Sequence, residues 1–137
     1  MPKAATTLLF LVCGVLLFPG CNRQPPGPKT VQVTGPIALD GQPIKEGNVI
    51  FRRLDGDLKS FGGRIQNGTY QITVEPGKMA VEVVASREVP GKFTMENAIQ
   101  EPVTEMYIPR KYNAETELII DVADDGKQVF SFELTSK

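Results

Sequence analysis

Residues 65–85 read IQNGTYQITVEPGKMAVEVVA, and this stretch decides the fold. Asn67-Gly68 is a typical two-residue hairpin turn, because both residue types tolerate positive φ. The residues that follow alternate between polar and apolar, which predicts a half-buried strand. A Pro-Gly turn comes next, and the apolar run 79–85 predicts a more central strand. The stretch therefore predicts antiparallel β-structure.

The same pattern continues through the rest of the chain. Further turn signals stand at Asp40-Gly41, Asp55-Gly56, Pro90-Gly91 and Asp124-Asp125-Gly126. Short strands are predicted between the turns, over 30–39, 47–54, 60–66, 69–74, 78–86, 116–122 and 127–135. No stretch shows a sustained 3.6-residue apolar period. We therefore expect an all-β domain over residues 30–137, built as a seven-stranded antiparallel β-sandwich.

One long connection stands out between the predicted strands. Residues 87–106 show no clear strand or helix pattern, and loops of this length are usually functional or poorly ordered. If this loop covers a ligand site, we expect a concave surface lined by Phe93, Met95 and Tyr107.

The first twenty residues are typical of a signal peptide. Lys3 supplies a positive charge, and residues 8–18 are an uncharged apolar run too short to span a bilayer. A short hydrophobic helix within the fold is the alternative. Residues 22–29 hold three prolines and form a predicted extended tether.

The residues around Cys21 sharpen this prediction. Leu17-Phe18-Pro19-Gly20-Cys21 resembles a bacterial lipobox. The resemblance implies cleavage before Cys21 and a diacylglycerol on its sulfur, with residues 21–29 as the lipidated tether. The expected location is then the cell envelope, anchored to a membrane, and a plain secreted form is the alternative.

Composition excludes several function classes. A net charge of −1 argues against a nucleic-acid partner. The chain has no histidine, and its two cysteines are Cys13 and Cys21, so a zinc site or a Cys–His nucleophile has no residues to build it. No cofactor motif is present. The acidic groups at 55–57 and 121–125 allow a calcium site, although Asp-Gly turns explain them by backbone geometry alone.

Several segments in order resemble carboxypeptidase regulatory-like, or transthyretin-like, domains. They are Val33–Ile44 with its Asp-Gly-Gln-Pro-Ile, then Glu46–Phe51, Gly68–Ile72 and Pro76–Lys78. Tyr107–Asn113 with Glu117-Leu118 is similar to a segment of small envelope lipoproteins of planctomycete-type bacteria. The resemblance implies a prealbumin-like β-sandwich, also described as Ig-like, and implies no catalytic residues.

Five residues are expected to act structurally. Pro43 fixes φ after a turn, Gly47 lets the chain bend into its strand, and Tyr70 packs in the core. Tyr112 is expected to pin the entry to the strand at 116–122, as the tyrosine of a tyrosine corner does, and Asn113 then turns the chain. The alternative makes Arg110, Lys111, Tyr112 and Asn113 part of a ligand surface.

Two function classes remain. The first is a non-catalytic envelope lipoprotein whose β-sandwich binds or organises an envelope protein or polysaccharide. The second is a small-ligand binding protein, for carbohydrate or peptide, that uses the 87–106 loop. An enzyme is not expected.

Overall fold

The computed structural model describes residues 25–137. The predicted signal peptide over 1–20 and Cys21 lie outside the described residues. The prediction of an all-β domain is confirmed. Within residues 25–137 the one helical element is a single 3₁₀ turn, η1, over Arg110–Tyr112.

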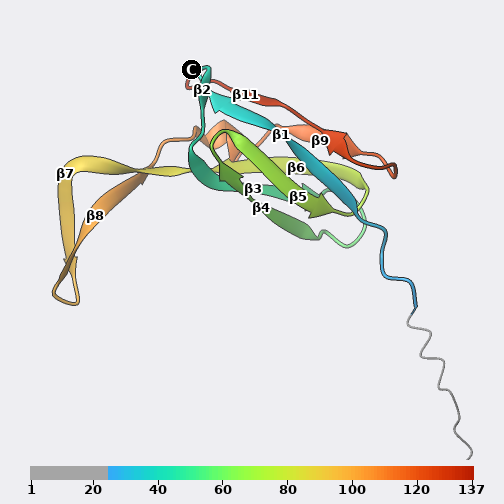
Figure 1. Cartoon of the computed structure of the whole chain (residues 1–137), viewed down its shortest axis with the longest axis horizontal. Helices are drawn as coiled ribbons and strands as arrows, with labels where there is room; N and C mark the ends of the chain where they lie inside the picture. The colour runs from blue at the N-terminus through green and yellow to red at the C-terminus, as the bar shows by residue number, and fades with distance from the viewer. Residues whose placement is uncertain (1–24) are drawn as a thin grey trace, which may run out of the picture.

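The strands form one large curled sheet and one small sheet (Figure 1). Their bounds are β1 Val31–Leu39, β2 Gln42–Pro43, β3 Glu46–Arg53, β4 Ser60–Gln66, β5 Thr69–Val74, β6 Gly77–Val84, β7 Ser86–Glu96, β8 Ile99–Met106, β9 Ile119–Val122, β10 Gln128–Val129 and β11 Phe132–Leu134. The large sheet runs in the order β10-β1-β5-β4-β3-β6-β9, and β2 and β11 also pair with β1. β7 and β8 pair only with each other.

Alternating side chains place the core on one side of the curled sheet. β5 alternates exposed and buried residues along its whole length, as the sequence predicts. Phe51 of β3 and Tyr70 of β5 have ring centroids 6.0 Å apart, and Phe132 of β11 lies 6.4 Å from Phe51 and 5.6 Å from Tyr70. Because β11 lies at the far end of the sheet order from β3, these contacts show that the curl encloses the core.

The expectation of purely antiparallel pairing over seven strands was wrong. β1 pairs antiparallel with β5 but parallel with β10 and then β11. The last expected strand, 127–135, is therefore two short strands separated at Phe130 and Ser131. At this break the Phe130 amide donates to the Thr34 carbonyl at 3.0 Å, and the Phe130 carbonyl accepts a hydrogen bond from the Tyr70 hydroxyl at 2.9 Å.

Gly35 of β1 makes this arrangement possible. A Cβ at Gly35 would lie 1.9 Å from the Phe130 carbonyl oxygen, a distance that no side chain could occupy. β1 continues through Gly35 and Pro36 without a break. Gly35 allows the C-terminal strands to approach β1.

The long connection expected over 87–106 is instead a β-hairpin, β7–β8, which we call the arm. It closes through Asn97 and Ala98, which both have positive φ, as a type I′ hairpin turn requires. The pairing is interrupted between Glu88 and Phe93, where Gly91 also has positive φ. Figure 1 shows the arm projecting from the body at the end opposite the N-terminal segment.

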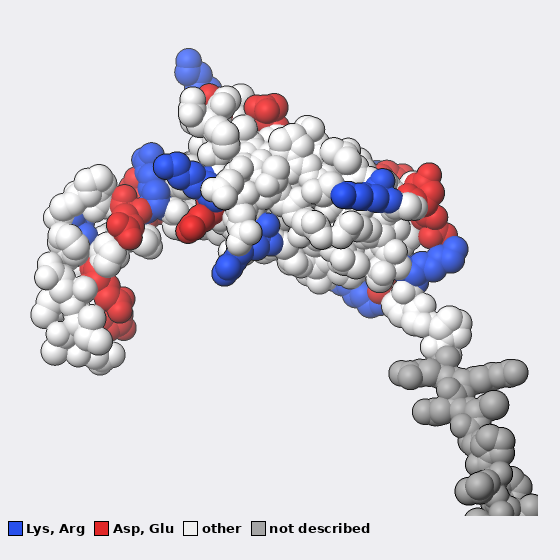
Figure 2. Space-filling model, viewed as in Figure 1, with Lys and Arg blue, Asp and Glu red and all other residues white. Residues whose placement is uncertain are grey.

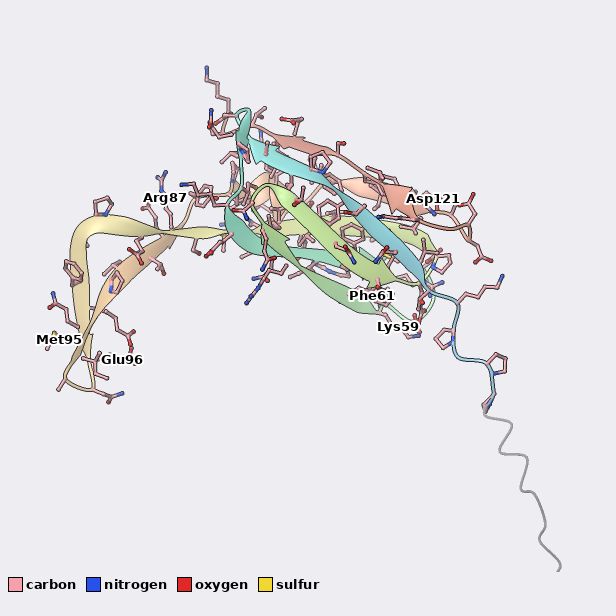
Figure 3. The ribbon with its side chains drawn as sticks, in the orientation of Figure 1. Lys59, Phe61, Arg87, Met95, Glu96 and Asp121 are labelled. Carbon is pink, nitrogen blue, oxygen red and sulfur yellow. The ribbon has the colours of Figure 1, made fainter. Side chains whose placement is uncertain are left out.

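The opposite end of the body, where the N-terminal segment leaves, carries a cluster of ion pairs. Glu75 is 8% exposed and accepts from Arg53 at 2.9 Å and from Lys59 at 2.8 Å. Figure 3 shows Lys59 at this end of the body. Hydrogen bonds to Glu75 and Asp57 raise the pKa of Lys59. Lys29 at the end of the tether pairs with Asp124 at 2.7 Å. Figure 2 shows acidic and basic side chains together at this end.

Candidate functional site

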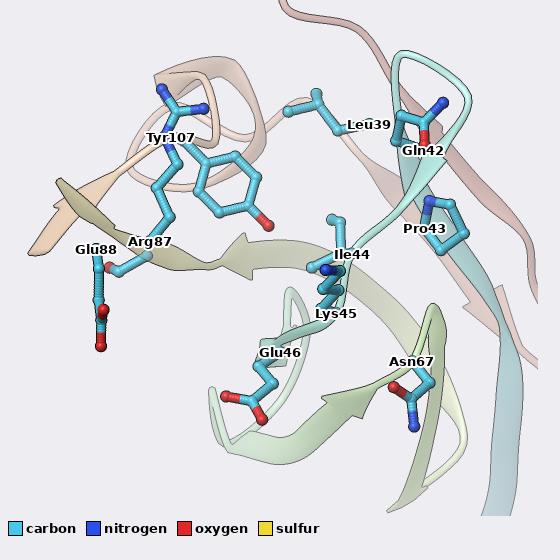
Figure 4. Close-up of a pocket in the computed structure, with 11 residues that line it drawn as sticks. Leu39, Gln42, Pro43, Ile44, Lys45, Glu46, Asn67, Arg87, Glu88 and Tyr107 are labelled. Carbon is cyan, nitrogen blue, oxygen red and sulfur yellow. The ribbon is translucent and has the colours of Figure 1, made fainter. Parts of the chain in front are cut away.

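A pocket of about 640 Å³ lies at the base of the arm (Figure 4). Three parts of the chain form it: the β1–β2 turn, the start of β3 beside the β4–β5 turn, and the start of the arm. Its lining residues are Leu39, Gln42, Pro43, Ile44, Lys45, Glu46, Asn67, Ser86, Arg87, Glu88 and Tyr107.

The pocket exists because the large sheet forks at this end. β6 pairs with β3 as far as Val84, which lies opposite Asn48. One residue after Ala85 the chain begins to pair with β8 instead, starting with Ser86 opposite Met106. The starts of β3 and β7 therefore separate, and the space between them is the pocket.

Gly47 lies at the point where the strands separate. A Cβ at Gly47 would lie 2.6 Å from the Val84 carbonyl oxygen and 2.9 Å from the Ala85 Cβ. The reason for glycine is thus the close approach of β6 and not the bend that the sequence suggested.

The apolar surface of the pocket comes from Leu39, Pro43, Ile44 and the Tyr107 ring. The Arg87 guanidinium lies 5.5 Å from the centroid of the Tyr107 ring and pairs with Glu105 at 2.9 Å. Figure 4 shows the Tyr107 ring between Arg87 and Ile44. Burial raises the pKa of the Tyr107 hydroxyl, and the positive charge of Arg87 opposes this increase. At neutral pH the hydroxyl is therefore protonated and able to donate a hydrogen bond.

The rim of the pocket is polar and charged. Within residues 25–137, the side chains of Lys45, Glu46, Asn67 and Glu88 form no hydrogen bond or ion pair with another residue. Seven of the eleven lining residues are polar or charged, so the pocket offers many hydrogen-bonding groups beside a small apolar surface. The arrangement can hold a ligand that offers both an apolar face and hydrogen-bonding groups.

The structure does not bring the expected binding residues together. Tyr107 lines the pocket, whereas Phe93 and Met95 lie on the arm, 58% and 69% exposed. Arg110 is exposed and pairs with Glu115 at 2.8 Å. Lys111 lies 5.1 Å from the centroid of the Tyr112 ring and contacts Thr135 and Lys137 near the C-terminus.

Tyr112 and Asn113 hold the approach to β9. The Tyr112 hydroxyl accepts from the Thr135 amide at 3.1 Å, and hydrogen bonds from Thr135 lower its pKa. Its ring is only half-buried, so it does not form the buried corner that the sequence suggested. Asn113 is 7% exposed and donates to the carbonyl oxygens of Ile108 and Pro109, each at 3.2 Å.

The remaining expected structural residues lie in the body. Pro43 is exposed in β2, opposite Ala38, and lines the pocket. Tyr70 is 2% exposed at the centre of the core.

Among residues 25–137 no three His, Cys, Asp or Glu side chains are placed to hold a metal ion. Asp55, Asp57 and Asp124, members of the two acidic groups, form ion pairs with Arg53, Lys59 and Lys29 respectively. No helix within this part of the chain is long and apolar enough to cross a membrane.

Sequence reasoning missed most of the pocket. Lys45, Glu46 and Asn67 stand next to turn signals, where polar residues are common for backbone reasons. Arg87 and Glu88 fall in the predicted long connection, where the sequence gives them no role. Only the position of Tyr107, beside a predicted loop of unusual length, gave a usable signal.

Comparisons with known proteins give no family. No protein-family model matches the chain, and no curated protein matches it. Among solved structures, the chain is similar to a 9R-lipoxygenase from Cyanothece PCC8801, at 16% identity and a TM-score of 0.37. That match covers 78% of this chain but only 16% of the lipoxygenase.

Proposed function

We propose that this chain is a non-catalytic envelope lipoprotein, anchored through Cys21, that presents a binding module away from the membrane. The module is a sandwich-like β-domain of the prealbumin type. The contact of Phe132 with Phe51 supports this architecture, because it joins β11, at one end of the sheet, to β3 across the core.

The observation that carries the proposal is the position of the tether relative to the pocket. The N-terminal segment enters β1 at Val31, and the pocket begins at Leu39, the other end of the same strand. A strand of this length spans about 30 Å. A tether over residues 22–29 that is extended, as the sequence predicts, would add about 25 Å at ~3 Å per residue. The pocket and the arm would thus stand roughly 50 Å from a lipid surface, accessible to an envelope protein or polysaccharide.

Mass spectrometry and membrane fractionation test the anchor. We expect the mature protein to begin at a diacylglyceryl-modified Cys21 and to remain in the membrane fraction. Cys21→Ser should yield soluble protein or an uncleaved precursor. An unmodified N-terminus downstream of Cys21 on native protein would refute the anchor.

A second candidate function is binding of a small carbohydrate or peptide in the pocket at the base of the arm. The Tyr107 ring offers an apolar surface for the ligand, and Asn67, Glu46 and Lys45 offer hydrogen-bonding groups free of other partners within residues 25–137. The ligand would rest against β7 but would not need the tip of the arm.

Thermal-shift measurements with cell-envelope sugars and short peptides test this second function. A ligand present at 100 times its Kd stabilises the fold by about 2.7 kcal/mol, which gives a clear increase in Tm. We expect Tyr107→Ala and Glu46→Gln to remove the shift, and Glu133→Gln, an exposed carboxylate on β11, to leave it unchanged. A shift that survives both pocket variants would place the ligand elsewhere.

A further inference from the structure

The arm is an unpartnered β-hairpin with two free edges. β7 and β8 pair only with each other, and Phe93, Met95 and Ile99 are 58%, 69% and 61% exposed. A two-stranded hairpin in water is marginally stable, and a free strand edge is a template for further pairing. Pairing with a further strand would therefore stabilise the arm.

The two edges of the arm differ in their ability to accept a strand. In a two-residue hairpin, the two residues that flank the turn exchange backbone hydrogen bonds; here they are Glu96 and Ile99. From this pair onward, non-hydrogen-bonded and hydrogen-bonded pairs alternate along the strands. Phe93 and Pro102 then form a non-hydrogen-bonded pair. Their backbone groups point outward, away from each other.

This alternation closes the β8 edge and leaves the β7 edge open. Pro102 has no amide to offer at the outer edge of β8, and its ring occupies that place. Glu101 also adds a negative charge to β8, whereas Glu105 is paired with Arg87. On β7, Phe93 and Met95 both direct an amide and a carbonyl to the free edge, and residues 92–96 contain no proline.

The open edge is complementary to itself. Residues 92–96 read KFTME. If two copies pair antiparallel about Thr94, Lys92 lies opposite Glu96 of the second copy, and Phe93 lies opposite Met95 of the second copy. Within residues 25–137 neither Lys92 nor Glu96 forms an ion pair. Shifting the register by two residues either way loses both opposite-charge pairs.

We propose that this protein self-associates through its arm, by antiparallel pairing of β7 with β7 of a second copy around Thr94. The two arms form a four-stranded sheet, β8-β7-β7-β8, with two-fold symmetry. Phe93 and Met95 of each copy exchange backbone hydrogen bonds with Met95 and Phe93 of the other. Their four side chains form one apolar cluster on one face, and the two Lys–Glu pairs lie on the opposite face.

Disulfide trapping tests this register directly. Thr94 lies on the two-fold axis in a non-hydrogen-bonded pair, where Cα atoms are about 4.5 Å apart and within disulfide range. In the full chain with Cys13→Ser and Cys21→Ser, Thr94→Cys should form a disulfide-linked dimer under mild oxidation. The control is Glu101→Cys, which lies opposite Thr94 on β8 and is also exposed. We expect at least tenfold less dimer from the control.

Exchanging the charges of Lys92 and Glu96, in the Thr94→Cys background, is the second part of the test. Lys92→Glu or Glu96→Lys alone places two like-charge pairs in the interface and should lower the rate of dimer trapping about tenfold. The double variant Lys92→Glu/Glu96→Lys restores both pairs and should restore trapping. Equal trapping at positions 94 and 101, no trapping at position 94, or no restoration by the double variant would overturn the proposal.

Discussion

Removing the Tyr70 hydroxyl tests how the C-terminal strands are held to the core. The Tyr70 side chain is 2% exposed, and its hydroxyl donates to the Phe130 carbonyl at 2.9 Å. Tyr70→Phe keeps the ring and removes this hydrogen bond. A neutral hydrogen bond contributes about 1 kcal/mol, and an unsatisfied carbonyl at a partly buried site adds to the loss, so we expect a decrease of about 1–2 kcal/mol in the free energy of unfolding.

Tyr70→Ala separates the ring from the hydroxyl. It also removes the contacts with Phe51 and Phe132 and leaves a cavity, so we expect a loss of about 3–5 kcal/mol. Urea unfolding of residues 25–137, followed by far-ultraviolet circular dichroism, measures both values with an unchanged slope. A Tyr70→Phe value within about 0.3 kcal/mol of wild type would refute the hydrogen bond as the link between β5 and the break at Phe130.

Four further predictions concern the same scaffold. Burial raises the pKa of Tyr70, so the folded state binds the phenol proton more tightly than the unfolded state does. The stabilisation from this proton should therefore be lost as the pH rises above 10. In that range, urea titrations should show that the free energy of unfolding of wild type falls relative to that of Tyr70→Phe by about 1.4 kcal/mol per pH unit. Gly35→Ala should destabilise by about 3 kcal/mol or more, because the new Cβ meets the Phe130 carbonyl, whereas Gly62→Ala enters open space and should leave Tm nearly unchanged. Glu75→Gln should cost about 2 kcal/mol at pH 7, because two charge-assisted hydrogen bonds are weakened, and equal stability of the variant in urea would contradict this role. Tyr112→Phe should cost about 1 kcal/mol, because it removes the hydrogen bond from the Thr135 amide. Tyr112→Ala should cost clearly less than Tyr70→Ala, because the Tyr112 ring is half-exposed. Thermal melts of the four tyrosine variants give the order.

Local signals were sufficient to predict most of the body. Asp40-Gly41 and Asn67-Gly68 have the positive φ angles that their residue types favour, and the strands beside Asn67-Gly68 have the predicted bounds. The arm was missed because its turn, Asn97-Ala98, lacks a glycine, and because Pro90 and Pro102 argue against strands unless an edge is free.

The sequence pattern could not predict which distant strands pair with one another. Nothing local to β1 indicates that one strand pairs with β5 on one side and with β10 and β11 in parallel on the other. The pocket was missed for the same reason, because it depends on the fork between β3 and β7 and not on any motif. The sequence predicts Tyr107 as a lining residue from its place beside the long connection, but Lys45 and Glu46, which line the same pocket, lie far from it in sequence.

The parallel pairing of β1 with the C-terminal strands has a consequence for the order of folding. Val33 pairs with Gln128 and Leu39 with Leu134, so the second edge of β1 stays open until the last residues of the chain are present. Contacts between such distant residues slow folding, since a long loop must close before they form. A chain still emerging from a ribosome cannot complete this sheet. The sheet closes only when residues 128–134 are available, and a chain that ends before residue 128 would expose β1 as an edge prone to aggregation.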